Sequence, residues 1–192
     1  DAVSTIAAIQ AFQGGDFDAY FTTFYANDIA KKIVGSKYDD DLSVAGNGSV
    51  GLGKAGDDSL LGNAYGTSRE TLKGGDGNDD IWGGAGGNDR LTGGLGSDTY
   101  WFTEDNGADT ITVSDTNDQD TVRFSTSWQP ADLRIWLTGN DLHMVAGSTE
   151  TVLDAWACGG GYQLNRFLFE QTGETYKVEI TDSGSGQFVQ IG

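Results

Sequence analysis

Residues 74–101 decide the fold: they read GGDGNDDIW, then one glycine, then GAGGNDRLT and GGLGSDTYW. Counted from Gly74, Gly84 and Gly93, these nine-residue copies share glycine at position four, aspartate at position six and an apolar residue at position eight. The position-six residues are Asp79, Asp89 and Asp98. A period of nine is an internal repeat, and short repeats of this kind wind into solenoids.

Each repeated position has a physical role. The glycines permit tight turns with positive φ and leave backbone carbonyls uncovered. The aspartate places a hard oxygen in the turn, and the apolar residue begins a short strand with one side chain pointing inward. Stacked turns therefore align carbonyls with carboxylates, an arrangement that suits calcium and its roughly 6–8 oxygen ligands. The chain has one Cys and one His, too few for a zinc site.

The repeat extends upstream with less regularity. Residues 53–61 (GKAGDDSLL) carry Asp58, and residues 35–43 (GSKYDDDLS) carry Asp40 but have Tyr38 where glycine is expected. Residues 44–52 are too degenerate to align, and residues 62–73 fit only through Glu70 and Leu72. A flexible Gly/Asp-rich linker is the alternative, but a linker does not keep aspartate and an apolar residue in register.

The pattern GGxGxDxUx resembles the nonapeptide of the RTX, or haemolysin-type, calcium-binding family. Downstream, DTYWF, DTI, DTVRF and DLRIWLTGNDL (residues 98–102, 109–111, 120–124 and 132–142) are similar to the domain that follows RTX repeats, such as the last RTX block of adenylate cyclase toxins. The resemblance implies an all-β protein, namely a short parallel β-roll of calcium repeats that binds several Ca²⁺ ions.

The expected calcium ligands fall into two groups. Side-chain oxygens are expected chiefly from Asp58, Asp79, Asp89 and Asp98, with Asp40, Asp76, Asp109 and Asp120 as further candidates. The glycine turns are expected to supply carbonyls around Gly56, Gly75, Gly77, Gly84, Gly86, Gly94 and Gly96.

The net charge of the chain limits the classes of molecule that it can bind. The 192 residues include 29 acidic and 11 basic residues, a net charge of −18. Nucleic acid and direct contact with an anionic membrane are disfavoured, because both rely on basic surface. Stacked aspartates repel one another until a cation neutralises them, so we expect the metal-free repeats to be loose and metal binding to drive folding.

The flanks predict caps for the roll. Apolar and aromatic spacings in residues 1–33 predict a helical N-terminal cap, with an aromatic sugar-binding patch as the alternative. The roll is expected over residues 34–101, and degenerate repeats with an antiparallel β cap over residues 102–177. The tail, residues 178–192, is either part of a type I secretion signal or an ordinary last strand.

Catalysis is not expected. His143 is the single histidine and lies in an apparent strand, which favours a packed or surface role. Carboxylate pairs recur along the repeats, whereas a glycosidase needs one pair. Cys158 has no partner for an internal disulfide and is expected to be a buried thiol. The chain begins at Asp1, so we expect a piece of a longer protein, with any catalytic domain upstream.

The resemblance implies a secreted module of a Gram-negative exporter that passes unfolded through a type I secretion channel and folds on calcium outside the cell. The alternative is a calcium-dependent interaction module of an S-layer protein or adhesin, which contacts a surface polysaccharide or associates with itself.

Overall fold

The computed structural model describes residues 22–25, 32–44, 46–63, 67–103, 107–113, 119–147, 149–154, 164, 166–180 and 184–191. Within these ranges the chain forms strands β1 to β17 and one short 3₁₀ helix, η2 (Pro130–Asp132). In the same ranges, no helix has the length and apolar character needed to cross a membrane. The all-β class expected from the sequence is confirmed.

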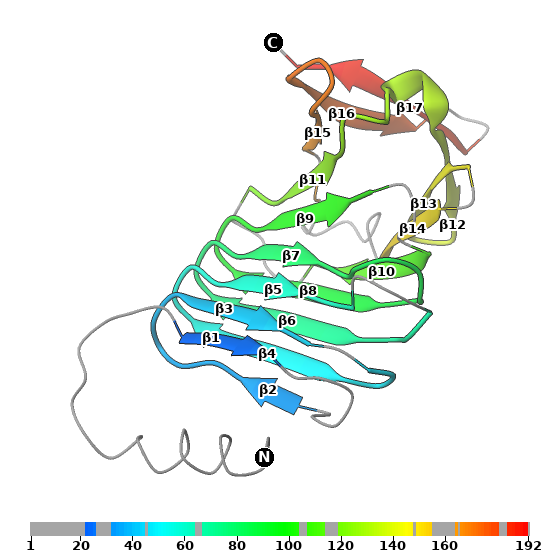
Figure 1. The fold of residues 1–192 in the computed structure, drawn as a ribbon. Coiled ribbons are helices and arrows are strands. Elements are labelled where there is room, and N and C mark those ends of the chain that lie inside the picture. Colours follow the sequence, from blue (N-terminus) through cyan, green and yellow to red (C-terminus); the bar gives the residue numbers. More distant parts are fainter. Residues whose placement is uncertain are drawn as a thin grey trace, which may run out of the picture.

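Two parallel ladders form the body of the molecule, and successive strands of the repeats alternate between them (Figure 1). The first ladder runs β1 (Thr22–Tyr25), β3 (Asp40–Ser43), β5 (Ser59–Leu61), β7 (Asp80–Trp82), β9 (Thr99–Phe102), β11 (Thr121–Phe124), β15 (Phe167–Phe169). The second runs β2 (Lys32–Val34), β4 (Val50–Ala55), β6 (Thr71–Asp76), β8 (Arg90–Leu95), β10 (Ala108–Thr112), β14 (Thr149–Asp154).

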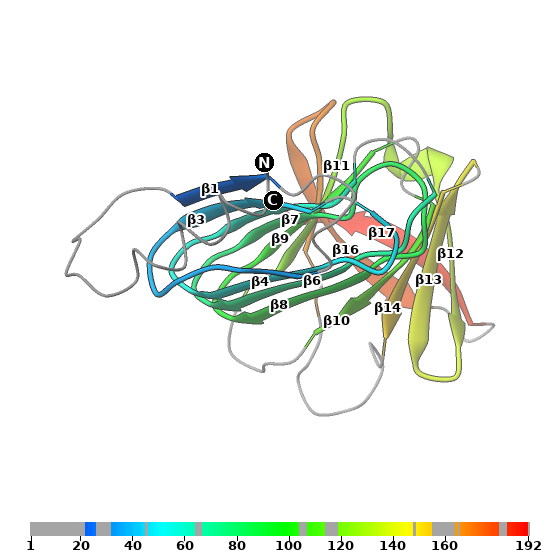
Figure 2. The same ribbon diagram turned by 60° about the horizontal axis from the view of Figure 1, so that its bottom comes forward.

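The two ladders face each other as the two layers of a flattened coil, a β-solenoid (Figure 2). Position eight of each repeat points between the layers. In the first ladder this column contains Leu60, Ile81 and Tyr100, each at most 1% exposed. The facing column contains Leu72, Leu91 and Ile111, which are equally buried. One inward apolar residue per strand is therefore enough to build a continuous core along the coil.

At the C-terminal end, four antiparallel strands join the two ladders. These are β12 (Arg134–Thr138), β13 (Asp141–Ala146), β16 (Glu174–Ile180) and β17 (Ser185–Gln190). Pairing runs from β14 through β13, β12, β17 and β16 to β15, so the last strands of both ladders have further partners. This C-terminal cap removes the open edges that a solenoid would otherwise present at this end.

An aromatic column holds the cap on the coil. Phe102, Phe124 and Phe169 occupy one register position on β9, β11 and β15. Their ring centroids are 6.2 Å apart between the first two and 4.7 Å apart between the last two. Phe188 from β17 packs edge-on against Phe169 at 5.1 Å. The core of the coil therefore continues into the cap without a break.

The expected helical cap over residues 1–33 is wrong for the parts that the structure describes. Thr22–Tyr25 and Lys32–Val34 are strands that pair with β3 and β4. TTFY consists of β-branched and aromatic residues, which favour strands, and the ladders supply a partner that propensity alone cannot predict. The other residues of that segment, and Cys158, lie outside the described residues.

Two further regions differ from the simple repeat pattern. Residues 44–52, which did not align, include the first half of β4 (Val50–Ala55) and so complete a turn of the coil. Parallel stacking also continues beyond Trp101, through β10, β11, β14 and β15. The tail contains β17, paired with β12 and β16. A role of this tail in secretion stays a prediction.

Candidate metal centre

The glycine turns stack directly on one another along one edge of the coil. Lys54, Gly75 and Gly94 share one register position, and the next position is shared by Ala55, Asp76 and Leu95. The N–H of Gly56 donates to the carbonyl of Asp76 at 2.9 Å, and the N–H of Gly77 donates to the carbonyl of Leu95 at 2.7 Å. Each turn is thus bonded through its backbone to the next.

The position-six aspartates form a column on this edge. The N–H of Asp58 donates to Oδ1 of Asp79 at 2.8 Å, and the N–H of Asp79 donates to Oδ1 of Asp98 at 2.9 Å. The same bond joins Asp40 to Asp58 at 2.8 Å and Asp98 to Asp120 at 2.9 Å. The structure therefore brings five of the predicted aspartates together, each one coil apart.

A second, shorter column lies on the opposite edge. The N–H of Glu70 donates to Oδ1 of Asp89 at 2.7 Å, and the N–H of Asp89 donates to Oδ1 of Asp109 at 2.9 Å. Glu70 thus takes the position of an aspartate despite the extra residues before it. The sequence placed Glu70 in register but did not select it as a ligand; a position-six carboxylate was the signal.

Six of these carboxylates keep a buried oxygen without a hydrogen-bond partner. Such oxygens are Oδ1 of Asp40, Oε1 of Glu70 and Oδ2 of Asp58, Asp79, Asp89 and Asp109. The six side chains are at most 2% exposed. Burying an unpartnered charged oxygen is costly, so this repeated pattern calls for a cation or a proton at each oxygen.

Glycine at position one leaves room for these oxygens. A Cβ built on Gly53 would lie 2.1 Å from Oδ2 of Asp58 and 2.6 Å from the carbonyl oxygen of Gly74. A Cβ on Gly35 would lie 2.7 Å from Oδ2 of Asp40, the oxygen that accepts the N–H of Ser36, and 2.6 Å from the carbonyl oxygen of Gly53. A carboxylate oxygen of one turn and a carbonyl oxygen of the next therefore meet beside the same glycine, and both are hard ligands of the kind calcium prefers.

Burial raises the pKa of these aspartates well above the ordinary value of 3.8. The pKa is raised to about 7 for Asp58 and to about 6 for Asp79, in each case chiefly by burial and further by neighbouring carboxylates. On the opposite edge burial raises the pKa of Asp109 to about 7 and that of Asp89 to about 8. Protons and cations therefore compete for the same oxygens near neutral pH.

The predicted glycine ligands also lie in the turns. Gly75 and Gly77 have φ of 138° and 135°, and a Cβ on either would lie 2.1 Å from the carbonyl oxygen of Lys54 or Gly56, respectively. The matching glycines, also with positive φ, are Gly56, Gly94 and Gly96 on this edge and Gly84 and Gly86 on the other. Only glycine allows the turns to approach this closely.

Asp76 does not join the aspartate column. Its side chain is exposed at position three. Among the described residues, no three side chains of His, Cys, Asp or Glu converge as a preformed metal centre. A calcium site here would therefore combine one or two carboxylates with backbone carbonyls, rather than use a cluster of acidic side chains.

A second ladder at position five was missed by the sequence reasoning. Oδ1 of Asp39 accepts the N–H of Asp57 at 2.8 Å, and Oδ1 of Asp57 accepts the N–H of Asn78 at 2.7 Å. Oδ1 of Asn78 in turn accepts the N–H of Ser97 at 2.8 Å. Each bond points in the direction opposite to those at position six. The signal was a short oxygen-bearing side chain at position five of every copy.

His143 packs against the cap surface, apart from both columns. Its ring stacks on Trp136 with centroids 5.1 Å apart and an angle of 6° between the planes. Its Nδ1 lies 3.0 Å from Oε1 of Glu150. This packing is the role that the sequence favoured for His143.

Comparisons with known proteins do not assign the chain to a family. No protein-family model matches the chain, and no curated protein matches it. The likeness to RTX proteins therefore rests on the nonapeptide motif, and the coil of stacked turns is consistent with it.

Proposed function

We propose that this chain is a calcium-binding module of the RTX, haemolysin-type kind, which folds when calcium binds. One observation carries the proposal: buried carboxylate oxygens without partners recur in successive turns on both edges of the coil, and one of them, Oδ2 of Asp58, lies with the carbonyl oxygen of Gly74 beside Gly53. A bound cation would satisfy these oxygens and offset the repulsion along each aspartate column.

Two sets of residues would hold the ions. The longer column would contribute Asp40, Asp58, Asp79, Asp98 and Asp120, together with the carbonyls of the glycine turns. The shorter column, on the opposite edge, would contribute Glu70, Asp89 and Asp109. Calcium supplies positive charge and accepts oxygens from several turns at once. Because the aspartate columns exist only in the coiled chain, the free energy of binding contributes directly to folding.

This coupling suits a secreted protein. Extracellular calcium-binding modules have dissociation constants of about 10⁻⁴–10⁻³ M, so their sites fill outside the cell and stay empty at cytosolic calcium levels. We infer that the chain passes unfolded through a type I secretion channel and then folds, which supports folding of a larger secreted protein. The C-terminal cap would provide the first stable surface on which the coil grows.

A calcium titration followed by circular dichroism, with magnesium as control, tests the proposal. We expect a cooperative gain of β signal at sub-millimolar to millimolar calcium and no gain with magnesium, which dehydrates reluctantly and demands stricter octahedral geometry. A chain that is fully folded in chelator, and whose stability does not rise with calcium, would refute it.

A second candidate function is a calcium-dependent cell-surface module of the S-layer or adhesin type. The observation in its favour is a pair of tryptophans on the outer face of the coil, Trp82 and Trp101, at outward positions of two adjacent strands. In this case calcium would stiffen the coil, and the outer face would make the contact.

A further inference from the structure

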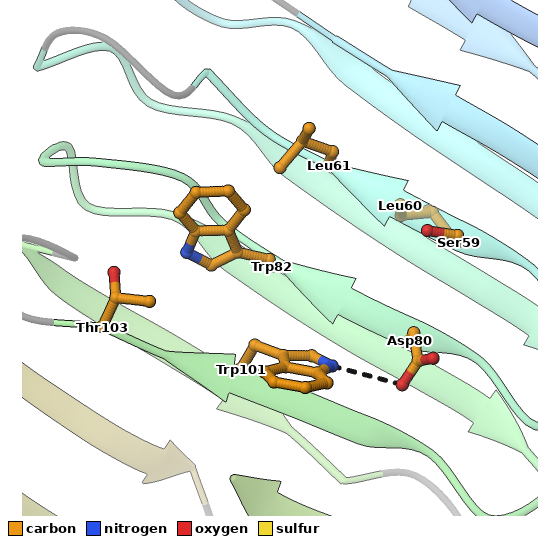
Figure 3. A pocket seen from close by; sticks show the side chains of 7 residues that line it. All are labelled: Ser59, Leu60, Leu61, Asp80, Trp82, Trp101 and Thr103. Carbon is orange, nitrogen blue, oxygen red and sulfur yellow. Dashed lines mark hydrogen bonds between the residues drawn. The ribbon is translucent and has the colours of Figure 1, made fainter. Parts of the chain in front are cut away.

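A groove of about 450 Å³ lies on the outer face of the first ladder, across β5, β7 and β9 (Figure 3). Its lining contains none of the column carboxylates, although Ser59 and Asp80 directly follow Asp58 and Asp79 in the chain. Its walls are formed by Ser59, Leu60, Leu61, Asp80, Trp82, Trp101 and Thr103. Ile81 and Tyr100 point into the core and are fully buried, so the residue after each of them points outward.

The tryptophans are not required by the repeat. The same outward position is Ser43 on β3, Leu61 on β5 and Arg123 on β11. A short polar or charged side chain is therefore compatible with the coil at this position. Two large, half-buried aromatic side chains side by side on the outer face of a sheet form a contiguous apolar patch, and such a patch is a candidate binding surface.

The Trp101 ring is held in a fixed orientation. Its Nε1–H donates to Oδ1 of Asp80 at 3.2 Å, and the Arg123 guanidinium lies 4.2 Å from the ring centroid. Arg123 is itself paired with Glu170 at 2.8 Å. In Figure 3 the Trp101 ring extends toward Asp80, whereas the Trp82 ring extends away from it. A rigid aromatic surface loses little conformational entropy when a ligand stacks on it.

Polar groups line the rim of the groove. The Ser59 hydroxyl and the Asp80 carboxylate are exposed on one side, and the Thr103 hydroxyl lies on the other (Figure 3). Aromatic faces with a few hydroxyl and carboxylate groups match the chemistry of a sugar ring, whose C–H face is apolar and whose edge carries hydroxyls.

Other ligand classes fit less well. The net charge of −18 and the adjacent Asp80 disfavour nucleic acid and other polyanions. A peptide cannot add as a strand at this site, because β7 is paired with β5 on one side and with β9 on the other. The three strands follow one another at about 4.8 Å, so an extended ligand lying across them meets one set of side chains per turn.

We propose that this groove, with Trp82 and Trp101 as stacking platforms and Asp80 as hydrogen-bond acceptor, binds a neutral, hydroxyl-rich oligosaccharide such as a segment of a surface polysaccharide. The site requires a folded coil and does not involve the carboxylate columns. It would give the module an attachment function in addition to calcium-driven folding.

Isothermal titration calorimetry on the full chain, under conditions where circular dichroism shows it folded, tests the proposal. The probes are short linear oligomers of glucose, mannose and N-acetylglucosamine, with dextran sulfate as the anionic comparison. We expect saturable binding of at least one neutral oligomer, with no binding of dextran sulfate. Trp82→Ala and Trp101→Ala should each weaken that binding by about tenfold, and Trp82→Phe should retain most of it.

Two further variants separate binding from folding. Asp80→Asn changes an exposed side chain and should weaken binding severalfold while the fold is kept. Trp136→Ala removes an indole from the cap, where it stacks on His143, and should leave binding unchanged. The proposal is overturned if the folded chain binds none of the neutral oligomers at millimolar concentration, binds only the anion, or binds equally well after Trp82→Ala and Asp80→Asn. Because folding is checked separately, failure here leaves calcium-driven folding standing.

Discussion

The backbone N–H of Asp58 donates a 2.8 Å hydrogen bond to Oδ1 of Asp79, the equivalent residue one coil later. That bond uses one carboxylate oxygen to fix the spacing of the turns and leaves Oδ2 of Asp79 buried without a partner. Asp58 and Asp79 thus each have one oxygen that bonds the preceding turn and a second, buried oxygen that requires a cation or a proton. The fold and the proposed calcium site therefore depend on the same side chains.

Loss of two adjacent carboxylates from the longer column should cripple calcium-induced folding. Asp79→Ala together with Asp98→Ala removes the acceptors for the N–H groups of Asp58 and Asp79, and also two of the proposed ligands. We expect the calcium midpoint of the β signal to rise by at least about tenfold, since each lost bond to a charged group costs about 1.5–3 kcal/mol. Circular dichroism during a calcium titration measures this.

Asp41→Asn is the matched control, because Asp41 is exposed on β3, next to the buried Asp40. It removes one negative charge without touching either column, so the midpoint should shift only slightly. An equal shift in the Asp41 variant would mean that overall charge, rather than the column, governs folding. An unchanged titration in the double alanine variant would refute the assignment of Asp79 and Asp98 as ligands.

The metal-free fold should be more stable in acid than at neutral pH. Burial raises the pKa of Asp58 from 3.8 to about 7, so between these pH values the folded chain holds a proton that the unfolded chain lacks. Stability of the metal-free fold therefore falls as pH rises through this window, and Asp79, Asp89 and Asp109 act in the same direction. In chelator, the β signal should be stronger at about pH 5 than at about pH 8.

Calcium should show the opposite trend, because it binds the deprotonated carboxylates. Its midpoint concentration should fall as pH rises from about 5 to about 8. Asp58→Asn removes one of the titrating groups and should make the metal-free stability less dependent on pH. A metal-free β signal that grows with rising pH would contradict the burial argument.

The sequence predicted the repeat architecture because it is encoded locally. Nine residues carry the whole signal. Glycine at position four specifies a turn, aspartate at position six specifies a ligand oxygen, and the apolar residue at position eight specifies an inward side chain. Asp58, Asp79 and Asp98 lie in one column. The spacing did not show that Asp89, in the copy between Asp79 and Asp98, belongs to the other column with Asp109. The alternating strands of the C-terminal cap were also readable, since each has its own turn signals.

Structural features that depend on pairing between successive turns of the coil could not be predicted from the sequence. Thr22–Tyr25 forms a strand because β3 offers it a pairing edge. Its β-branched and aromatic residues favour a strand, but this local preference is too weak to exclude the helix that the wider aromatic spacing suggested. Residues 44–52 lack the motif, yet β4 is held by pairing with both β2 and β6. The position-five ladder joins residues about one coil apart in the sequence, and these residues become neighbours only when the chain is folded into the coil.

Replacing Lys54 with glycine should stabilise the folded chain. Lys54 occupies position two, where the two following turns have Gly75 and Gly94, and its φ of 96° is unfavourable for a residue with a side chain. Relief of that strain, less the extra backbone entropy of glycine, should raise stability by about 0.5–1 kcal/mol. Urea unfolding in saturating calcium measures the change.

Gly75→Ala provides the opposite test at the next turn. Its Cβ would lie 2.1 Å from the carbonyl oxygen of Lys54, and its φ is 138°, so the turn must move. We expect a loss above about 2 kcal/mol. Equal stabilities for the wild type, Lys54→Gly and Gly75→Ala would show that position two carries no conformational constraint.

Phe124 should be essential to the joint between coil and cap. The ring is 4% exposed and stacks on Phe169, with Phe102 and Phe188 beside it. Phe124→Ala leaves a cavity at the place where the core passes into the cap, so we expect a loss of about 3–5 kcal/mol in the calcium-loaded state. Thr121→Ala, on the outer face of the same strand, should cost less than about 1 kcal/mol. If urea unfolding in calcium gave both variants the same small loss, the coil would be folding independently of its cap, and the cap could not be the surface on which folding begins.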